Sequence, residues 1–293
     1  MIFSFSQIID ENTNEVWLDS KEIDEILIEK GSLNLKKLSA FNNKISSLPD
    51  NLFNLTNLER INLSKNRITA LPITVNQFKN LEVLDLNFNE LNEIPETIGD
   101  LQNLKFLYLA ENNLSSLPKS LHKLKNLLYL NFSFNHFEEL PDSISDLNLI
   151  ELRIYNNFIK ALPGNIGTLV SLIELHAMNN QIDEIPFSIG CLVNLKRLML
   201  ENNHLRNLPN SIGNLSSLNE LDLRSNHLEC LPNSIGELKA LRRLDLRNNR
   251  LTTIPEGIAD LPNLEKLDVR LNRHLEISPC FNKLKERGCL IYI

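Results

Sequence analysis

Glycine, cysteine and long apolar runs are all scarce in this chain, and each scarcity excludes a class of protein. Only nine of the 293 residues are glycine, and no glycine-rich loop of the kind that holds nucleotide phosphates is present. The four cysteines do not gather in pairs at either end, which argues against disulfide-capped ends and favours a reducing, cytosolic setting. Apolar runs stop after a few residues, far short of the ~20 that a membrane-spanning helix needs.

The chain also lacks an excess of basic charge. The net charge is −7, and residues 1–34 alone carry eight acidic and two basic side chains, so the rest of the chain is close to neutral. Without a basic field, nucleic acid and anionic lipid are excluded as partners. The segment MIFSFSQIIDENTNEVW contains no Lys or Arg, and polar residues interrupt its apolar stretch, so we expect no secretory signal.

What the chain does have is a repeat. The frame L-x-x-L-x-L-x-x-N-x-L-x-x-L-P occurs eleven times, beginning at Leu35, Leu58, Leu81, Leu104, Leu127, Leu149, Leu172, Leu195, Leu218, Leu241 and Leu264. The interval is 23 residues except from Leu127 to Leu149, where it is 22. The shorter interval predicts a tighter return segment at 141–149, followed by a strand in unchanged register with Leu152 directed into the core.

This frame resembles the leucine-rich repeat, a family of stacked repeats. More narrowly it is similar to the 23-residue class of Ras-suppressor and plant intracellular Ras-group proteins, because tails such as IPETIGDLQNL (94–104) follow L-P-x-x-I-G-x-L. The resemblance implies an α/β solenoid, a curved horseshoe with a parallel concave sheet and short helical turns on the convex side. We expect an N-terminal cap at 1–34, eleven repeats at 35–278 and a C-terminal cap at 279–293.

An asparagine recurs at one position of every repeat, at the turn that leaves the strand. Its side-chain amide can both donate and accept, so it can satisfy backbone groups that the turn orphans. We therefore predict a structural ladder rather than a chemical site, formed by Asn43, Asn66, Asn89, Asn112, Asn135, Asn157, Asn180, Asn203, Asn226, Asn249 and Asn272. The proline that follows suits the first position of a short helical turn.

Both ends need caps, because an open solenoid exposes its core and a strand edge. Asp19 and Glu22 match a capping box, which predicts a helix through residue 27 that ends at Gly31. Residues 2–18 are expected to form a hairpin. At the C-terminus, FNKLKERGCLIYI predicts a helical turn, a stop at Gly288 and a terminal strand, and it resembles the caps of stand-alone bacterial leucine-rich repeat proteins.

No catalytic constellation is visible, so we expect no enzyme, no cofactor and no metal. His136, His204 and His227 share one repeat position, and the last two should stack about one strand spacing apart. A metal would need further ligands, and the neighbouring positions offer mainly Asn and Arg. Solvated turn histidines are the favoured interpretation.

The outward strand positions carry the candidate site. They predict a protein-binding patch in the middle of the array, formed by Val83, Phe106, Tyr108, Tyr129, Phe134, Tyr155, His176, Met178 and Met199. The alternative is that these aromatics merely stack on one another along the sheet. Further on, Arg224 and Arg247 stand beside a row of aspartates, which fits either an internally neutralised ladder or charge-paired recognition of a partner.

Two functions fit this pattern. One is a non-catalytic scaffold that binds a protein partner in its concave face, and the resemblance to Ras-suppressor repeats makes a small GTPase or a signalling enzyme the expected kind of partner. The other is a bacterial effector that engages host proteins through the same face, in the host cytoplasm. We expect a monomer, with a homodimer through the concave patch as the main rival.

Overall fold

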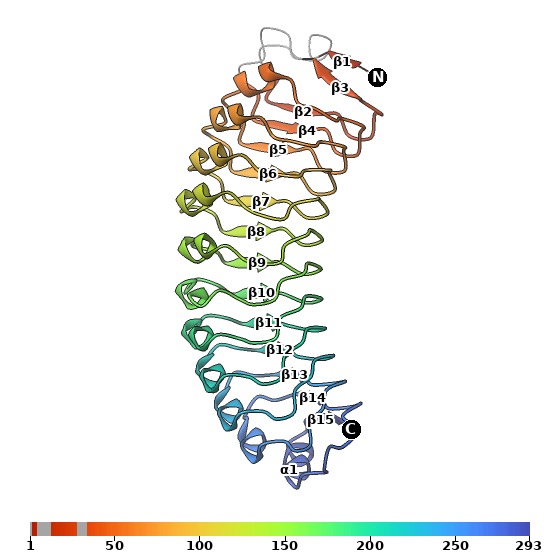
Figure 1. Ribbon diagram of the computed structural model, residues 1–293, viewed down its shortest axis with the longest axis vertical. Coiled ribbons are helices and arrows are strands. Elements are labelled where there is room, and N and C mark those ends of the chain that lie inside the picture. The colour runs from red at the N-terminus through yellow and green to blue at the C-terminus, as the bar shows by residue number, and fades with distance from the viewer. Residues whose placement is uncertain (1, 5–12, 28–33) are drawn as a thin grey trace. The chain divides into compact units, whose positions relative to one another are not determined.

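The computed structural model describes residues 2–4, 13–27 and 34–293, the first of these ranges as backbone only (Figure 1). The chain divides into two compact parts, residues 1–137 and residues 138–293. Within the described ranges, no helix combines the length and the hydropathy of a membrane span.

Residues 1–137 form parallel strands of three residues each. Strand β1 (Ile2–Ser4) pairs with β3 (Glu25–Leu27) in a separate small sheet. The main sheet of this part runs in sequence order through β2 (Glu15–Trp17), β4 (Lys37–Ser39), β5 (Arg60–Asn62), β6 (Val83–Asp85), β7 (Phe106–Tyr108) and β8 (Tyr129–Asn131).

Residues 138–293 repeat the same arrangement. Their parallel strands are β9 (Glu151–Arg153), β10 (Glu174–His176), β11 (Arg197–Met199), β12 (Glu220–Asp222), β13 (Arg243–Asp245), β14 (Lys266–Asp268) and β15 (Leu290–Tyr292). The six main-sheet strands of residues 1–137 and the seven strands of residues 138–293 make thirteen among the described residues, all parallel and in an open arrangement. The predicted fold class, a solenoid of parallel strands and short helical turns, is confirmed.

Short 3₁₀ turns return the chain after each strand from β4 to β13, and Figure 1 shows them stacked along one side of the strands in each part. They span Asp50–Asn54, Ile73–Gln77, Glu96–Asp100, Lys119–Lys123, Asp142–Asp146, Ile166–Thr168, Phe187–Cys191, Asn210–Asn214, Asn233–Glu237 and Glu256–Asp260. The repeat prolines precede these turns rather than opening them. Pro118, for example, has an extended ψ of 145°, and its carbonyl accepts from the N–H of Leu121.

The frame leucines form the core, as their periodicity predicts. Leu104, Leu107 and Leu109 are fully buried, while the strand residues between them point to the opposite face. Leu152 is also fully buried and pairs with Leu175, so the register prediction after the short interval is confirmed. The missing residue is absorbed at Leu147, whose ψ is 164° where the equivalent residues of most other repeats lie near 60°.

The repeated asparagines are buried, except for half-buried Asn43, and Asn180 shows how their amides bond on both sides. The Oδ1 of Asn180 accepts from the N–H of Ile159 at 3.1 Å, and its Nδ2 donates to the carbonyls of Ile154, Ala177 and Met178 at 3.0–3.2 Å. One side chain thus links two successive turns. These groups lie where the strand has ended, and buried backbone groups there need partners from side chains. The Met178 carbonyl also accepts from the N–H of Asn156 at 3.0 Å.

A second row of asparagines, which the sequence analysis missed, lies just before the first leucine of the frame. The Nδ2 of Asn103 donates to the carbonyl of Lys79 at 2.8 Å, and Asn194 donates in the same way to Val170 at 2.9 Å. These bonds are exposed and tie one return segment to the previous one. The signal was present in the sequence as an N-L pair at eight of the eleven frame starts.

Glycine is required where successive 3₁₀ turns touch. A Cβ on Gly190 would lie 2.5 Å from the carbonyl oxygen of Ser211, closer than any real contact of that kind. Gly99, Gly167, Gly213 and Gly236 are equally close to the following turn, so these glycines serve the close approach of return segments, because neighbouring backbones could not stack at this spacing around a side chain.

The helix predicted to begin near Asp19 is wrong. Ser20 and Glu22 both have φ of 56°, in the left-handed region, and strand β3 follows where helix was expected. Gly31, the predicted stop, lies outside the described residues. The hairpin predicted for residues 2–18 is wrong too, because β1 and β2 pair with β3 and β4, both in parallel.

Hydrogen bonds to the first repeat explain the error. The carboxylate of Asp19 accepts from Ser39 Oγ at 2.5 Å and from the N–H of Phe41 at 3.0 Å, so it caps a neighbouring turn rather than its own helix. The N–H of Ile23, which is fully buried, donates to Asn43 Oδ1 at 3.0 Å. The segment behaves as an incomplete repeat.

The C-terminal segment has the predicted elements. Helix α1 (Cys280–Glu286) ends before Gly288, whose φ is 85°, and β15 pairs with β14 as the last strand. Arg287 Nη1 and Nη2 donate to the carbonyls of Ala259 and Leu261, both at 2.5 Å. The helix thereby satisfies backbone groups that the preceding 3₁₀ turn leaves open.

Candidate protein-binding face

The first and third residues of each strand point to one side of the sheet, which we call the sheet face. In residues 1–137 it carries an aromatic cluster of Phe106, Tyr108 and Tyr129. The ring of Tyr129 lies 4.8 Å from that of Tyr108 and 6.4 Å from that of Phe106, measured between centroids. Val83 lies beside Phe106 in register, and all four side chains are half-buried.

These distances bear on the alternative that the aromatics merely stack on one another. Separations of 4.5–7 Å are those of favourable aromatic pairs, so each ring of the cluster is partly covered by its neighbours. Stacking and exposure therefore coexist: the rings support one another and still present part of their surface to solvent.

Two further phenylalanines of residues 1–137, Phe88 and Phe134, lie directly before ladder asparagines. Both are exposed, at 55% and 42%, and both have left-handed backbones with φ of 54° and 53°. Bulky residues rarely adopt this conformation, which costs them on the order of 1 kcal/mol or more. Most equivalent positions in the other repeats hold smaller polar residues, as at Asn42, Asn156, Asn179, Asn202, Ser225 and Asn248.

The sheet face of residues 138–293 carries the remaining predicted residues. Tyr155, His176, Met178 and Met199 are all half-buried. His176 Nε2 lies 2.9 Å from Glu174 Oε2, so its ring is engaged in a polar contact rather than in an apolar patch. The sequence patch is thus aromatic in one part and mixed in the other.

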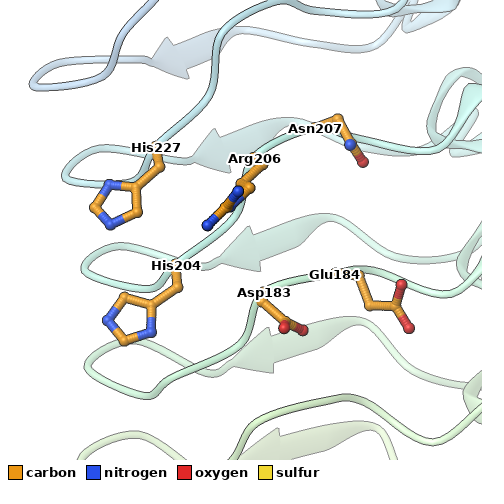
Figure 2. Close-up of a pocket in the computed structure, with 6 residues that line it drawn as sticks. All are labelled: Asp183, Glu184, His204, Arg206, Asn207 and His227. Carbon is orange, nitrogen blue, oxygen red and sulfur yellow. The ribbon is translucent and has the colours of Figure 1, made fainter.

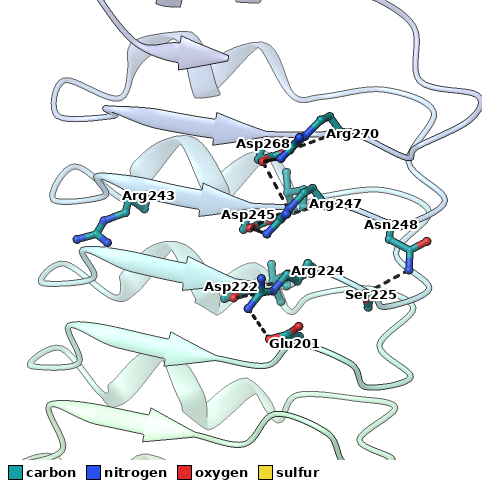
Figure 3. A network of polar contacts seen from close by, with 12 residues as sticks. Glu201, Asp222, Arg224, Ser225, Arg243, Asp245, Arg247, Asn248, Asp268 and Arg270 are labelled. Atoms are coloured by element: carbon teal, nitrogen blue, oxygen red, sulfur yellow. Dashed lines mark hydrogen bonds and ion pairs between the residues drawn. The ribbon is translucent and has the colours of Figure 1, made fainter. Parts of the chain in front are cut away.

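Arginine–aspartate pairs dominate the C-terminal strands (Figure 3). Arg247 binds Asp245 through two nitrogens, Nε to Oδ1 at 2.9 Å and Nη2 to Oδ2 at 2.6 Å. Arg270 binds Asp268 in the same way, at 2.9 and 2.7 Å. Asp245 and Asp268 are thus each paired with an arginine of the ladder.

Two buried aspartates of this ladder differ in how well they are paired. Asp268 is fully buried, and although burial raises its pKa, hydrogen bonds from Arg270 outweigh this and the pKa is lowered. Burial raises the pKa of Asp222 to about 6. The cause of the difference is local: Arg224 Nε lies 3.1 Å from Asp222 Oδ2 without hydrogen-bond alignment, because Arg224 Nη2 is drawn to Glu201 at 2.5 Å.

Sequence reasoning missed Trp17, which is 59% exposed on the sheet face. Its neighbours Val16 and Leu18 are buried, and β2 pairs with β4 so that Trp17 stands opposite Ser39. Phe41, which is 37% exposed, follows in the same repeat as Ser39. The signal was present in the sequence: in V-W-L, alternation directs Val16 and Leu18 inward and therefore Trp17 outward. The hairpin prediction did not say which side of the sheet Trp17 would lie on.

A shallow pocket lies away from the strands, and Figure 2 shows its lining: Asp183, Glu184, His204, Arg206, Asn207 and His227. The predicted stack of His204 and His227 is confirmed, with ring centroids 5.6 Å apart and planes 14° from parallel. Among the described residues, the one group of metal-ligating atoms that lie within reach of a common ion does not include these histidines.

Comparisons with known proteins agree with this architecture. Three family models match the chain. The model described as "Leucine-rich repeat region" matches residues 148–226 and 188–290, and the model described as "Leucine rich repeat" matches 79–137. The model described as "Leucine Rich repeats (2 copies)" matches 33–75 and 56–101. No curated protein matches the chain in sequence.

Solved structures give the extent of the similarity. A leucine-rich repeat protein of the bacterium Leptospira interrogans is 32% identical with a TM-score of 0.69, covering 93% of this chain and 84% of that one. The plant peptide hormone receptor RGFR1, solved with RGF2, is 27% identical with a TM-score of 0.83, covering 100% of this chain but 49% of the receptor chain. A chain of the octameric complex of Latrophilin 3, Unc5D and FLRT2 is 26% identical with a TM-score of 0.73, covering 88% and 82%.

The fold is a solenoid of repeats, and the outward strand residues are not part of its leucine core. The chain belongs to the leucine-rich repeat proteins. Proteins of this fold generally serve as interaction modules rather than enzymes.

Proposed function

We propose that this chain is a non-catalytic module that binds a protein partner on its sheet face. The observation that carries the proposal is the aromatic cluster of Phe106, Tyr108 and Tyr129. The leucine core does not need these side chains, yet three large aromatics share one outer face. Aromatic residues are what the energetic centre of an interface tends to use.

The surroundings of the cluster support the same function. Exposed Phe88 and Phe134 at strained positions and exposed Trp17 add apolar surface to residues 1–137. In residues 138–293 we assign Tyr155, Met178 and Met199 to the contact surface, and Arg224 and Arg247 to its charged rim. A small GTPase or a signalling enzyme is the proposed kind of partner, and the support is the similarity of the 23-residue frame to Ras-suppressor-type repeats.

The proposed setting is a reducing compartment such as the cytoplasm. All four cysteines are free thiols, two of them exposed. We also assign the end of the chain after Pro279 to a cap of the type found in stand-alone bacterial repeat proteins.

The test is quantitative capture by the purified chain. The triple variant Phe106→Ala/Tyr108→Ala/Tyr129→Ala should lose the proteins that the wild type retains from lysate of its own cells. Phe187→Ala is the matched control, since this aromatic is 73% exposed on a 3₁₀ turn and not on a strand. Equal capture by wild type and triple variant would refute the assignment of the site.

A second candidate is an effector that engages host proteins through the same face. The similarity to a bacterial protein at 32% identity favours it. Capture from foreign-cell lysate but not from own-cell lysate, abolished by the same triple variant, would support the effector over the scaffold.

A further inference from the structure

Three side chains with metal-ligating atoms converge on the sheet face of residues 138–293. Glu151 is the first residue of β9, and Glu174 and His176 are the first and third of β10. His176 Nε2 lies 2.9 Å from Glu174 Oε2 and 3.9 Å from Glu151 Oε1. Ligand atoms of all three residues lie within 4.8 Å of one another, and no other such group exists among the described residues.

The separations suit a small divalent ion. Zinc binds imidazole nitrogen and carboxylate oxygen at about 2.0–2.1 Å, which places tetrahedral ligand atoms roughly 3.3 Å from each other. The separations of 2.9 and 3.9 Å from His176 Nε2 fall on either side of this value. Modest rotation of the carboxylates would equalise them.

The scaffold holds the three residues in place. Glu151 and Glu174 are paired in register between hydrogen-bonded parallel strands, and His176 is two residues further on the same face. Their side chains are only 22%, 16% and 13% exposed. Because the backbone is fixed by the sheet and the side chains are largely covered, little conformational entropy is left to lose on binding.

Two arginines bond to the carboxylates. Arg197 bonds to Glu174 Oε1, which leaves Oε2 toward His176, an outer hydrogen bond of the kind that is usual in metal sites. Arg153 Nε bonds at 2.5 Å to Glu151 Oε1, the oxygen that lies 3.9 Å from His176 Nε2, so an ion would compete with Arg153 for this oxygen.

Charge sets the expected strength of such a site. Two guanidiniums already offset two carboxylates, so a divalent ion adds net positive charge unless an arginine swings away. Both arginine side chains can do so, since Arg153 is 36% and Arg197 47% exposed. The affinity is therefore expected to be moderate, below that of buried structural zinc sites.

From this arrangement we propose that Glu151, Glu174 and His176 bind one divalent transition-metal ion of the zinc class. One imidazole with two carboxylates leaves a coordination position open, which a water or a side chain of a bound protein can occupy. The site is independent of the proposed binding function, because it rests on its own residues in β9 and β10.

The test uses calorimetric titration of the full chain with zinc chloride, in a Cys191→Ser/Cys230→Ser background that removes the two exposed thiols. The expected result is saturable binding of one ion, weakened at least tenfold by His176→Gln and by the near-isosteric Glu151→Gln. The matched control is His227→Gln, which removes a histidine of the same part that stacks on His204 and should leave the affinity unchanged.

A second readout does not depend on heat. Cobalt(II) in place of zinc should give visible absorption bands of a four- or five-coordinate ion in wild type, and these should vanish in Glu151→Gln, a variant that keeps the shape of the site. Absence of saturable binding, or equal binding by wild type and His176→Gln, would show that the cluster is an ion-pair network only.

Discussion

The two parts of the chain use one scaffold to present two different surfaces. In residues 1–137 the sheet face carries Phe106, Tyr108 and Tyr129. In residues 138–293 the position of Tyr108 is taken by aspartates such as Asp245 and Asp268, each paired with the arginine two residues further on. Both kinds of side chain cover their neighbours along the sheet. The aromatics do so by ring contact and retain apolar surface, while the ion pairs neutralise one another and leave little net charge.

This difference separates what the repeat demands from what it permits. Leucines and ladder asparagines recur in both parts with the same burial and bonds, because the closed repeat cannot form without them. The outward strand positions have no such constraint, so they vary in chemistry while the backbone does not. Recognition is therefore expected to lie in the outward rows, and stability in the inward ones.

The largest expected effect tests whether the scaffold is equal in both parts. Asn89→Ala and Asn180→Ala should each lower the free energy of unfolding by about 3 kcal/mol, since each strands a buried N–H and several carbonyls. The measurement is chemical denaturation of the two variants. Asn194→Ala, which removes a single exposed bond, is the control and should cost well under half as much.

A clear inequality between Asn89→Ala and Asn180→Ala would break the comparison. It would mean that the two parts differ in their scaffold as well as in their faces.

The inward rows were predictable from the sequence because a period of 23 residues leaves each leucine and asparagine one role. The N-terminal segment was not. Ile23 and Ile26 are spaced as on a helix, but the N–H of Ile23 donates to Asn43, in the following repeat, and Ile26 lies in β3, which pairs with β1. Helix prediction from residue spacing takes only local sequence into account, so it misses a hydrogen-bond partner that lies in another repeat.

The candidate site was predictable only in part. The alternation placed Phe106 and Tyr129 on the outer face correctly, yet their stacking depends on rotamers that no pattern specifies. Similarly, the aspartates at 222 and 268 occupy the same repeat position, and their different pairing follows from Glu201, one repeat earlier, which draws Arg224 away.

The next prediction sharpens the contrast in binding. With an isolated partner, Tyr129→Ala should weaken affinity by tenfold or more, or about 2 kcal/mol as for a central aromatic anchor. Because the ring also packs on Tyr108, the free energy of unfolding should fall by roughly 1 kcal/mol. Surface plasmon resonance and denaturation of the same sample measure both.

Arg247→Gln is the counterpart from the charged part. Its guanidinium is already paired with Asp245, so the change should mainly slow association and reduce its salt dependence. If Arg247→Gln weakened affinity more than Tyr129→Ala, the charged face rather than the aromatic cluster would be the centre of the interface.

A smaller effect concerns the pH dependence of the charged part. The pKa of Asp222 in the folded state, about 6, lies above its ordinary value of 3.8, so the folded chain binds this proton more tightly than the unfolded chain. Ionised Asp222 therefore destabilises the fold at pH 7, and this cost disappears as the pH falls through 6 toward 4. Asp222→Asn should raise the free energy of unfolding by about 2 kcal/mol at pH 7 and by much less at pH 4.5.

Asp268→Asn provides the opposite sign. Its pKa is lowered in the folded state, so the carboxylate stabilises the fold above its ordinary pKa and this contribution is lost only as the pH falls below about 4. This variant should be less stable than wild type at pH 7. Equal responses of the two variants would show that the pairing with Arg224 and Arg270 does not differ as described.

The smallest expected effect concerns residues 1–137, where an exposed phenylalanine with a left-handed backbone should lower the stability of the fold. Phe88 is 55% exposed with φ of 54°, a conformation that asparagine adopts at far lower cost. Phe88→Asn should therefore raise the free energy of unfolding by about 1 kcal/mol, while removing an apolar ring from the proposed contact surface. The reverse change in residues 138–293, Asn179→Phe at φ of 53°, should lower the free energy of unfolding by a similar amount.

Thermal denaturation of both variants measures the pair of changes. A gain in stability of Phe88→Asn accompanied by weaker partner binding would show that Phe88 is retained for recognition. A loss of stability in Phe88→Asn would instead mean that the ring packs usefully on its own repeat and that the strained backbone is no sign of function.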